Sequence, residues 1–322
     1  MRTSLAFVLL GMLAACGSPD GEDITPDAAD NLPPPPDRGF RVISPDITIE
    51  PGQEITYCYF FRTPNTEPMA VKHWKSEMTP GSHHMIMYTT NTDAKAPGTV
   101  SAEECGFGSG GTSNVPKWTY SAQTPSAEIK LPTDDGAGQP LAQDIAPNTA
   151  AYFQMHYFNG TDLPISAHVV LDAFALEADV EYTKTAPFIT FNGDISIGPG
   201  AVGHVESQSC STPAGSKFWM MSTHAHKQAV LTRVLDASAE VFRSDDWEHP
   251  GASMFMTPPE FYSFSSGKLT YECTYDNNTG DNANKTISTG DSAKDDEMCM
   301  ASGYFFPATK AVFCYNNIIV PF

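Results

Sequence analysis

The sequence has few basic residues. It contains 18 Lys and Arg against 38 Asp and Glu, which gives a formal net charge of −20. A chain this acidic lacks the positive surface that holds a phosphate backbone, which argues against nucleic acid as a partner. Its acidic clusters, such as residues 295–297, do not have the spacing of an EF-hand loop. We interpret them as solvated loops and not as calcium sites.

The sequence also lacks the patterns of long helices. After residue 15 no stretch is long and apolar enough to cross a bilayer, and no segment has a capped apolar stripe of period 3.6. Short apolar or alternating runs separated by Gly, Pro and Asn are typical of antiparallel strands. The pattern predicts an all-β chain with two consecutive antiparallel β-sandwich, jelly-roll-like domains. The predicted strands cover residues 55–61, 85–88, 150–157, 167–176, 188–191, 201–206, 218–223, 229–235, 268–275 and 311–320.

The first residues have the pattern of an export signal. A basic Arg2 precedes an apolar core too short to span a membrane, and the segment ends Leu13-Ala14-Ala15-Cys16-Gly17. This ending resembles the lipobox of bacterial lipoproteins, which implies a signal peptide at 1–15 and lipidation at Cys16. An ordinary cleavable signal is the alternative. We therefore expect an exported, lipid-anchored protein of the bacterial cell envelope, with Gly17 favouring the outer membrane.

Composition divides the remaining chain into a linker and two domains. Residues 16–38 are rich in Pro, Asp and Gly, so they cannot bury a core and are predicted to be an extended linker. A change of pattern near residues 181–187 predicts domains at 39–182 and 183–322. Polar loops without regular structure are expected at 106–112 and 277–295.

Seven cysteines are present, and none lies in a Cys-x-x-Cys pair, which argues against zinc-ribbon and thioredoxin-like roles. Without Cys16 there are six, an even number in an exported chain, which predicts three disulfides. Six cysteines allow fifteen pairings, and their spacing does not choose among them.

His224 and His226 follow the strand-like run at 218–223. Residues i and i+2 of a strand point to the same side, about 7 Å apart, so the two imidazoles can converge on one metal ion. As an isolated pair they also fit two ordinary sheet histidines.

Two further histidine motifs lie in the first half. His83 and His84 are adjacent, and on a regular strand they would point to opposite faces. If both bind one ion, the backbone there must be irregular; otherwise one belongs to the core and one to the surface. The third motif is Gln154-Met155-His156-Tyr157, whose histidine by itself also fits a core residue.

The last motif is Glu297-Met298-Cys299. A thioether is a soft ligand that favours Cu(I), and imidazole serves both copper oxidation states. His-His, Gln-x-His-Tyr, His-x-His and Glu-Met-Cys, in this order, resemble the copper type II ascorbate-dependent monooxygenases, the family of peptidylglycine α-hydroxylating monooxygenase and dopamine β-monooxygenase. The resemblance covers about residues 58–314.

The resemblance implies two copper ions that alternate between Cu(I) and Cu(II), with ascorbate or another one-electron reductant as cosubstrate. His83, His84 and His156 match the ligands of the electron-transfer copper in the first domain. The ligands of the oxygen-binding copper, where hydroxylation occurs, match His224, His226 and Met298. Gln154 matches a glutamine near the route between the coppers. Implied disulfides are Cys58–Cys105, Cys210–Cys314 and Cys273–Cys299, with Cys299 a staple beside Met298.

One further segment resembles the family, but we assign it no role. This segment is residues 247–250. Four histidines without identified partners are interpreted as structural: His73, His168, His204 and His249.

Three positions depart from the peptide-hydroxylating members. Ser222 stands where they carry a carboxylate-binding arginine, and Met300 and Ser302 replace an asparagine and a tyrosine of their substrate site. A serine hydroxyl cannot replace a bidentate guanidinium, which argues against peptides ending in glycine. Met221, Met300 and Phe305 are candidates for a less polar pocket, although each also fits ordinary core.

The predicted function is copper-dependent hydroxylation of a C–H bond of an unidentified small organic substrate with O2. The alternative is a copper-binding or copper-storing surface lipoprotein that holds the metal without turnover. A structural or adhesive lipoprotein without copper is a third possibility, and zinc also suits a three-histidine site. The oligomeric state stays open.

Overall fold

The computed structural model describes residues 32–106, 114 and 116–320. The predicted signal peptide at 1–15, the predicted lipidation site Cys16 and most of the predicted linker therefore lie outside the described residues. The chain divides into Met1–Pro34 and a compact unit, Pro35–Phe322. Within the described ranges there is no helix long and apolar enough to span a membrane.

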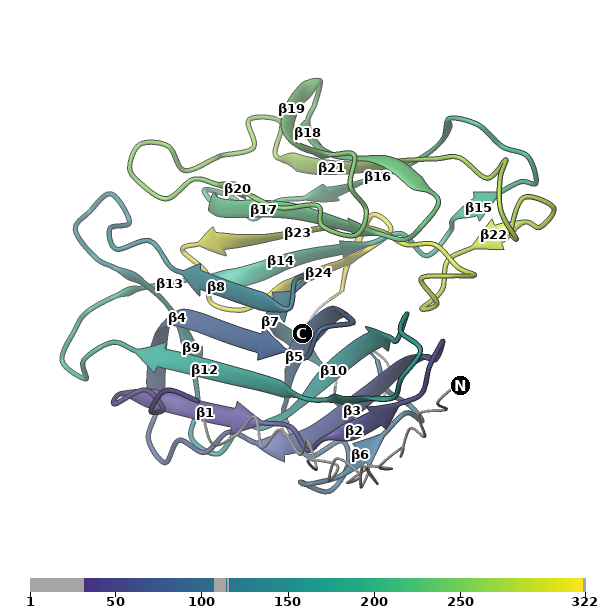
Figure 1. Ribbon diagram of the computed structural model, residues 1–322. Helices are drawn as coiled ribbons and strands as arrows, with labels where there is room; N and C mark the ends of the chain where they lie inside the picture. Colours follow the sequence, from purple (N-terminus) through teal and green to yellow (C-terminus); the bar gives the residue numbers. More distant parts are fainter. Residues whose placement is uncertain (1–31, 107–113, 115, 321–322) are drawn as a thin grey trace, which may run out of the picture. The chain divides into compact units, whose positions relative to one another are not determined.

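Strands of the first half form two main sheets (Figure 1). One has the order β1 (Gly39–Ile43), β12 (Val169–Ala175), β4 (Met69–Met78), β9 (Leu141–Ile145) and β13 (Thr183–Lys184), with β8 (Ser126–Lys130) also paired to β4. The other has the order β6 (Val100–Ser101), β3 (Glu54–Arg62), β10 (Ala150–Phe158), β5 (Ser82–Thr90) and β7 (Lys117–Ala122). A small sheet pairs β2 (Ile47–Ile49) with β11 (Ile165–Ala167).

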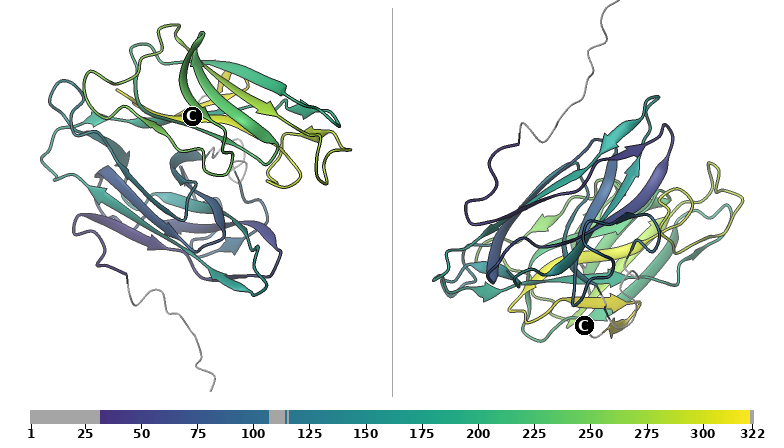
Figure 2. Two further views of the ribbon diagram at one scale, coloured as in Figure 1. Left: turned by 45° about the horizontal axis from the view of Figure 1, so that its top comes forward. Right: turned by 90° about the horizontal axis from the view of Figure 1, so that it is seen from below.

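Strands of the second half form two further main sheets (Figures 1 and 2). The first has the order β20 (Ser253–Met254), β17 (Lys217–Ala225), β23 (Cys299–Phe306), β14 (Ala186–Phe191), β24 (Val312–Tyr315) and β25 (Ile318–Val320). The second has the order β16 (His204–Ser211), β21 (Lys268–Tyr275), β18 (Ala229–Asp236) and β19 (Ala239–Ser244). A small sheet pairs β15 (Ser196–Ile197) with β22 (Ile287–Ser288).

The all-β prediction is confirmed, and a jelly-roll-like sandwich is compatible with these sheets. Sheet membership changes at β13, which pairs in parallel with β9 and is followed by strands that pair only among themselves. That change lies beside the predicted domain boundary at 182/183, which itself stays a prediction.

Several strand predictions were wrong in detail. The run at 311–320 is not one strand but the hairpin of β24 and β25, whose turn places Asn316 at a φ of 56°. Asparagine tolerates this left-handed conformation, so the turn is local in origin. β16 begins at His204 and not at residue 201, and the expected loop at 277–295 contains β22. β4 was not predicted because Lys72 and Lys75 interrupt its apolar alternation.

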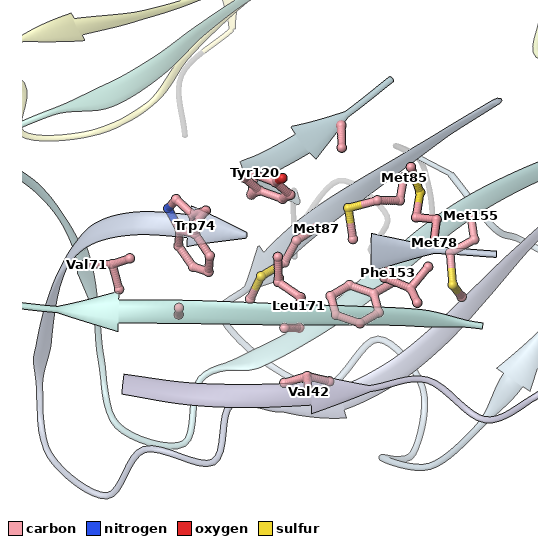
Figure 3. Packing of buried hydrophobic residues seen from close by; sticks show 14 of the residues in the cluster. Val42, Val71, Trp74, Met78, Met85, Met87, Tyr120, Phe153, Met155 and Leu171 are labelled. Carbon is pink, nitrogen blue, oxygen red and sulfur yellow. The ribbon is translucent and has the colours of Figure 1, made fainter. Parts of the chain in front are cut away.

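The core of the first half fills the space between its sheets (Figure 3). Trp74 and Met78 of β4 pack there with Phe153 and Met155 of β10 and with Leu171 of β12. The part of β10 from Ala150 to Tyr157 is buried on both faces, and β3 and β5 pair with its two edges. A histidine in this strand is therefore held in a rigid, dry setting.

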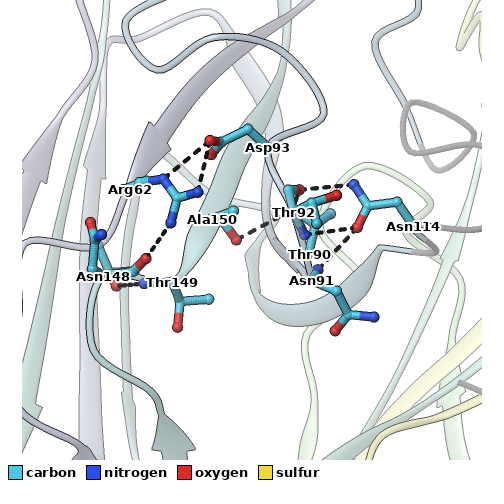
Figure 4. Close-up of polar contacts among 10 residues, drawn as sticks. Arg62, Thr90, Asn91, Thr92, Asp93, Asn114, Asn148, Thr149 and Ala150 are labelled. Atoms are coloured by element: carbon cyan, nitrogen blue, oxygen red, sulfur yellow. Dashed lines mark hydrogen bonds and ion pairs between the residues drawn. The ribbon is translucent and has the colours of Figure 1, made fainter.

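Polar contacts close the other end of β5 and β10 (Figure 4). Arg62 pairs with Asp93 at 2.8 Å and donates to the carbonyl of Asn148, which joins two turns. The side-chain oxygen of Asn114 accepts hydrogen bonds from the backbone amides of Asn91 and Thr92. His84 and His156 pair toward the opposite end of these two strands.

Candidate metal centre

A β-bulge brings the adjacent histidines of β5 together. His84 pairs with His156 of β10, but the next residue of β10, Tyr157, pairs with Ser82 and not with His83. His83 is therefore the extra residue of a bulge, which turns its side chain away from strict alternation. The irregular backbone that both histidines would need in order to bind one ion is thus present at this motif.

His83, His84 and His156 form a cluster that fits a metal ion. One ring nitrogen from each lies within 4.8 Å of the others. Among the described residues, Nε2 of His83, Nδ1 of His84 and Nδ1 of His156 are buried and have no hydrogen-bond partner. Burying unpaired polar nitrogens is costly, whereas three lone pairs converging on a cation are satisfied. The donor set is that of a copper or zinc site.

Burial keeps the imidazoles of this cluster in the form that binds metal. Loss of solvent lowers the pKa of His83 to about 3 and that of His84 well below its ordinary value, and the neighbouring histidines add to both effects. Both rings are thus neutral at pH 7, and their lone pairs are free of protons.

Glu54, the first residue of β3, orients the third histidine. Its Oε1 lies 2.9 Å from Nε2 of His156, and this hydrogen bond lowers the pKa of Glu54. An ionised carboxylate accepts the Nε2 proton, so the tautomer of His156 leaves Nδ1 unprotonated. No sequence motif indicated Glu54, because its contact depends on the pairing of β3 with β10.

The second set of candidate ligands lies at the end of β17 and the beginning of β23. His224 is in β17, His226 follows its last residue, and Met298 directly precedes β23. The two strands pair Ala225 with Cys299, so the ladder ends beside all three candidate ligands. The rings of His224 and His226 are 5.3 Å apart between centroids, and Nε2 of His226 is buried without a partner among the described residues. Burial lowers the pKa of His226 to about 4 and that of His224 well below its ordinary value.

Gln123, just after β7, fixes the orientation of His224. Its Oε1 is 2.7 Å from Nδ1 of His224, and its Nε2 donates to the carbonyl of Thr223 at 3.2 Å. The amide oxygen can only accept, so Nδ1 carries the proton and Nε2 is the nitrogen left for a metal. The sequence carried no signal for this contact between residues about a hundred positions apart.

The two histidine sets adjoin. Ring centroids are 5.3 Å apart for His84 and His224, 5.6 Å for His83 and His224, and 6.4 Å for His83 and His226. Trp247 belongs to the segment 247–250, which resembles the family but was given no role. Its ring centroid lies 5.5 Å from that of His83. Five imidazoles therefore form one continuous cluster.

A cavity of about 880 Å³ opens onto this cluster. It is lined by His84 of the first predicted ligand set and by His224 and Met298 of the second. Gln154 lines it as well. Its apolar lining includes Ile86, Trp118, Phe191, Met300, Phe313 and Val320.

The positions that depart from the family divide between the cavity and its surroundings. Met300 and Ser302 line it. Met221 and Phe305 instead belong to the core of the second half, so their candidacy as pocket residues was wrong. Ser222 is buried and donates to the carbonyl of Gly251 at 2.6 Å, which leaves its hydroxyl engaged away from the cavity.

Three disulfides brace the fold: Cys58–Cys105, Cys210–Cys314 and Cys273–Cys299. These are the pairs that the resemblance implies. Cys299 is the residue after Met298, so the bond to Cys273 of β21 holds the start of β23 where the thioether is presented.

The structural likeness of this chain to solved structures is weak, and no curated protein matches its sequence significantly. The major capsid protein P2 of bacteriophage PM2 is similar over 83% of this chain and 97% of its own, with 7% identity and a TM-score of 0.35. PBCV-1 VP54, fitted into a reconstruction of the virophage Sputnik, is similar over 83% of this chain and 94% of its own, with 7% identity and a TM-score of 0.29. Likenesses this weak carry no argument about fold or function.

A family model gives the informative comparison. Residues 205–320 match the model described as copper type II ascorbate-dependent monooxygenase, C-terminal domain. The matched range contains His224, His226 and Met298. The comparison thus supports this family for the C-terminal domain of the chain and suggests copper-dependent oxidoreductase activity.

Proposed function

We propose that this protein is a copper-dependent monooxygenase that hydroxylates a C–H bond of a small apolar substrate with O2 and ascorbate or another one-electron reductant. The observation that carries the proposal is the cluster of five adjoining imidazoles beside Met298 at the end of an apolar cavity, of which His84, His156 and His226 are buried. The family match over residues 205–320 supports the same chemistry.

The two ligand sets have different parts in this proposal. His83, His84 and His156 would hold a copper that passes electrons, and His224, His226 and Met298 would hold the copper at which the substrate reacts. Bound copper supplies one-electron redox chemistry and activation of O2, and the thioether favours the Cu(I) state. The chain itself lowers the pKa of His83, His84, His224 and His226 by burial, fixes two tautomers through Glu54 and Gln123, and shields the site from water.

The cavity favours an uncharged apolar or aromatic substrate. Among the described residues that line it there is no Lys or Arg, and its two carboxylates, those of Glu104 and Asp291, belong to exposed residues. A substrate carboxylate would find no bidentate partner there, and Ser222 is engaged elsewhere. Met300, Phe313 and Trp118 offer apolar contacts instead.

We further propose that the protein is exported and attached to the bacterial envelope by lipid at Cys16, with O2 and the organic substrate as its partners. This part rests on the residues around Cys16. Mass spectrometry of the mature N-terminus tests it, because a diacylated Cys16 is expected and an unmodified N-terminus contradicts it.

Oxygen consumption by the copper-loaded protein tests the activity. With ascorbate and a panel of apolar substrates, the wild type is expected to consume O2 in proportion to the product formed. His224→Ala and Met298→Ala are expected to lose this coupled consumption. His204→Ala is the matched control, since His204 lies in the same half and pairs with Glu206.

The outcomes separate the alternatives. Copper binding without substrate-coupled O2 consumption in the wild type would support a copper-binding or copper-storing protein. Absence of stoichiometric copper after loading would support a structural role instead.

A further inference from the structure

Glu297 is a buried acid that the proposed reaction does not use. Its side chain has no exposed surface. No lysine or arginine of the described residues forms an ion pair with it. Burial raises the pKa of Glu297, whereas the backbone hydrogen bonds that it accepts favour the ionised form and lower it. An acid in such a position needs a structural reason for being kept.

The carboxyl group of Glu297 joins two segments that are far apart in the chain. Its Oε2 accepts hydrogen bonds from the backbone amides of His226, at 3.0 Å, and Met298, at 3.2 Å. Its Oε1 accepts one from the backbone amide of Gln228, at 2.6 Å. Two of these three donors belong to residues of the predicted second copper site.

Glu297 makes these contacts at the point where the pairing of β17 with β23 ends. The ladder between β17 and β23 stops at Ala225 and Cys299, so the next backbone amides have no strand partner. Left unpaired inside the protein, each would carry the full desolvation cost of a buried donor. A carboxyl group has two acceptor oxygens and can satisfy several such donors together.

The residue before Glu297 also orients His226. The backbone carbonyl of Asp296 lies 3.2 Å from Nδ1 of His226, so this nitrogen donates and Nε2 is left unprotonated. Nε2 is the nitrogen that is buried without a partner. Residues 296–298 thus set the tautomer of the histidine, hold its backbone and present the thioether.

We propose that Glu297 is a positioning residue that holds His226 and Met298 at a fixed spacing, so that Nε2 and the thioether sulfur bind the same copper ion. The inference rests on the proposed function only for the identity of the metal. It concerns how the site is built and not whether the site turns over.

Cu(I) binding by the full chain tests this role. Glu297→Gln keeps the size of the side chain but replaces one acceptor oxygen with an NH2 group, which opposes the backbone amides. We expect X-ray absorption of the Cu(I)-loaded variant to lose the copper–sulfur contribution of Met298. Competition with a Cu(I) chelator should show roughly 10–100-fold weaker binding at that site, with the three-histidine site unchanged.

Asp236→Asn is the matched control. Asp236 is also buried in the second half, and it accepts hydrogen bonds from the backbone amides of Ser265, at 2.7 Å, and Ser266, at 3.0 Å. Its donors are not candidate ligands, so this variant should lose stability while keeping the copper–sulfur signal. If Glu297→Gln does not fold, Glu297→Asp replaces it, since its shorter carboxylate should reach fewer of the three amides.

Each result decides the inference. An unchanged copper–sulfur signal and unchanged affinity in the Glu297 variant would overturn it, as would equal losses in the Asp236 control. A wild type without any copper–sulfur contribution would overturn it too. A wild type that shows this contribution but no coupled O2 consumption would overturn the proposed monooxygenase activity and leave the role of Glu297 standing.

Discussion

Single residues outside the motifs decide which nitrogen of three of the histidines is offered to a metal. Glu54 sets His156, Gln123 sets His224, and the carbonyl of Asp296 sets His226. Such partners hold ring orientation and raise ligand basicity. The candidate centre is therefore preorganised by residues that no metal-binding motif contains.

Replacement of Glu54 tests this at one site. Glu54→Gln is expected to weaken copper binding to His83, His84 and His156 by about 10-fold or more, because the ionised acceptor for the Nε2 proton is lost. Competition with a chelator measures the change. Glu128→Gln is the control, since Glu128 pairs with His73 at 2.8 Å outside the cluster; equal affinities in all three proteins would contradict the prediction.

The buried histidines also predict how the metal-free protein responds to pH. Their folded pKa values are lowered, to about 3 for His83 and about 4 for His226, whereas an unfolded histidine titrates near 6.5. Above pH 6.5 these histidines are neutral in both the folded and the unfolded protein, so they do not lower the free energy of unfolding. Below pH 6.5 the unfolded chain takes up protons that the native protein cannot, so stability falls as pH falls toward the folded pKa values.

Urea unfolding between pH 7.5 and 5 measures this effect. Each such histidine should contribute a loss approaching 1.4 kcal/mol per pH unit below about 6.5. His84→Ala should show a shallower dependence than the wild type, because burial lowers the pKa of His84 as well. Identical slopes in the two proteins would contradict the assignment.

At the scale of elements, the ends of strands build the site. A bulge at the start of β5 collects one histidine pair, and the end of the β17–β23 ladder collects the other pair with Met298. A disulfide fastens the second of these ends to a neighbouring strand. Cys273–Cys299 ties β23 to β21 at the residue after Met298.

Removal of that disulfide should affect both stability and copper. Cys273→Ser with Cys299→Ser is expected to cost about 3 kcal/mol, from the lost constraint on a loop with a sequence separation of 26. Weaker Cu(I) binding should accompany it because the start of β23 is released. The double variant of Cys210 and Cys314, with a separation of 104, should lose at least as much stability but keep Cu(I) affinity. The reverse order of Cu(I) affinities would argue against a role for Cys299 as a staple.

At the scale of the whole described unit, the two halves share apolar packing. One core cluster contains Trp74 and Tyr120 from the first half and Trp219, Tyr304 and Phe306 from the second. The hydroxyl of Tyr304 donates to the carbonyl of Thr119 at 3.3 Å. Shared burial of this kind couples the stability of both halves.

Calorimetry of Trp219→Ala tests that coupling. Trp219 is fully buried, stacks on Tyr304 with ring centroids 5.0 Å apart, and donates to Oγ1 of Thr185. The substitution should cost about 3–5 kcal/mol and lower the midpoint of one cooperative transition. Two separate transitions, of which only one moves, would show that the halves unfold independently.

The local sequence pattern was enough to predict strands whose apolar and polar residues alternate regularly. It was also enough to identify the histidine motifs. β21 was predicted with its observed bounds, Lys268–Tyr275, because its apolar residues recur at every second position between Gly267 and the polar residues after Tyr275. β4 was missed because its lysines face solvent between buried positions. A local window cannot tell an exposed lysine in a strand from one in a loop.

The sequence by itself determined the all-β class and, through order and spacing, the residues whose chemistry suits copper. Only the tertiary structure decided that five imidazoles adjoin, that Met300 and Ser302 line a cavity while Ser222 does not, and that Glu54, Gln123 and Glu297 support the ligands. The physical reason is range. Alternation and ligand type are properties of neighbouring residues, whereas several of these contacts join positions more than a hundred residues apart and exist only once strand register and packing have formed.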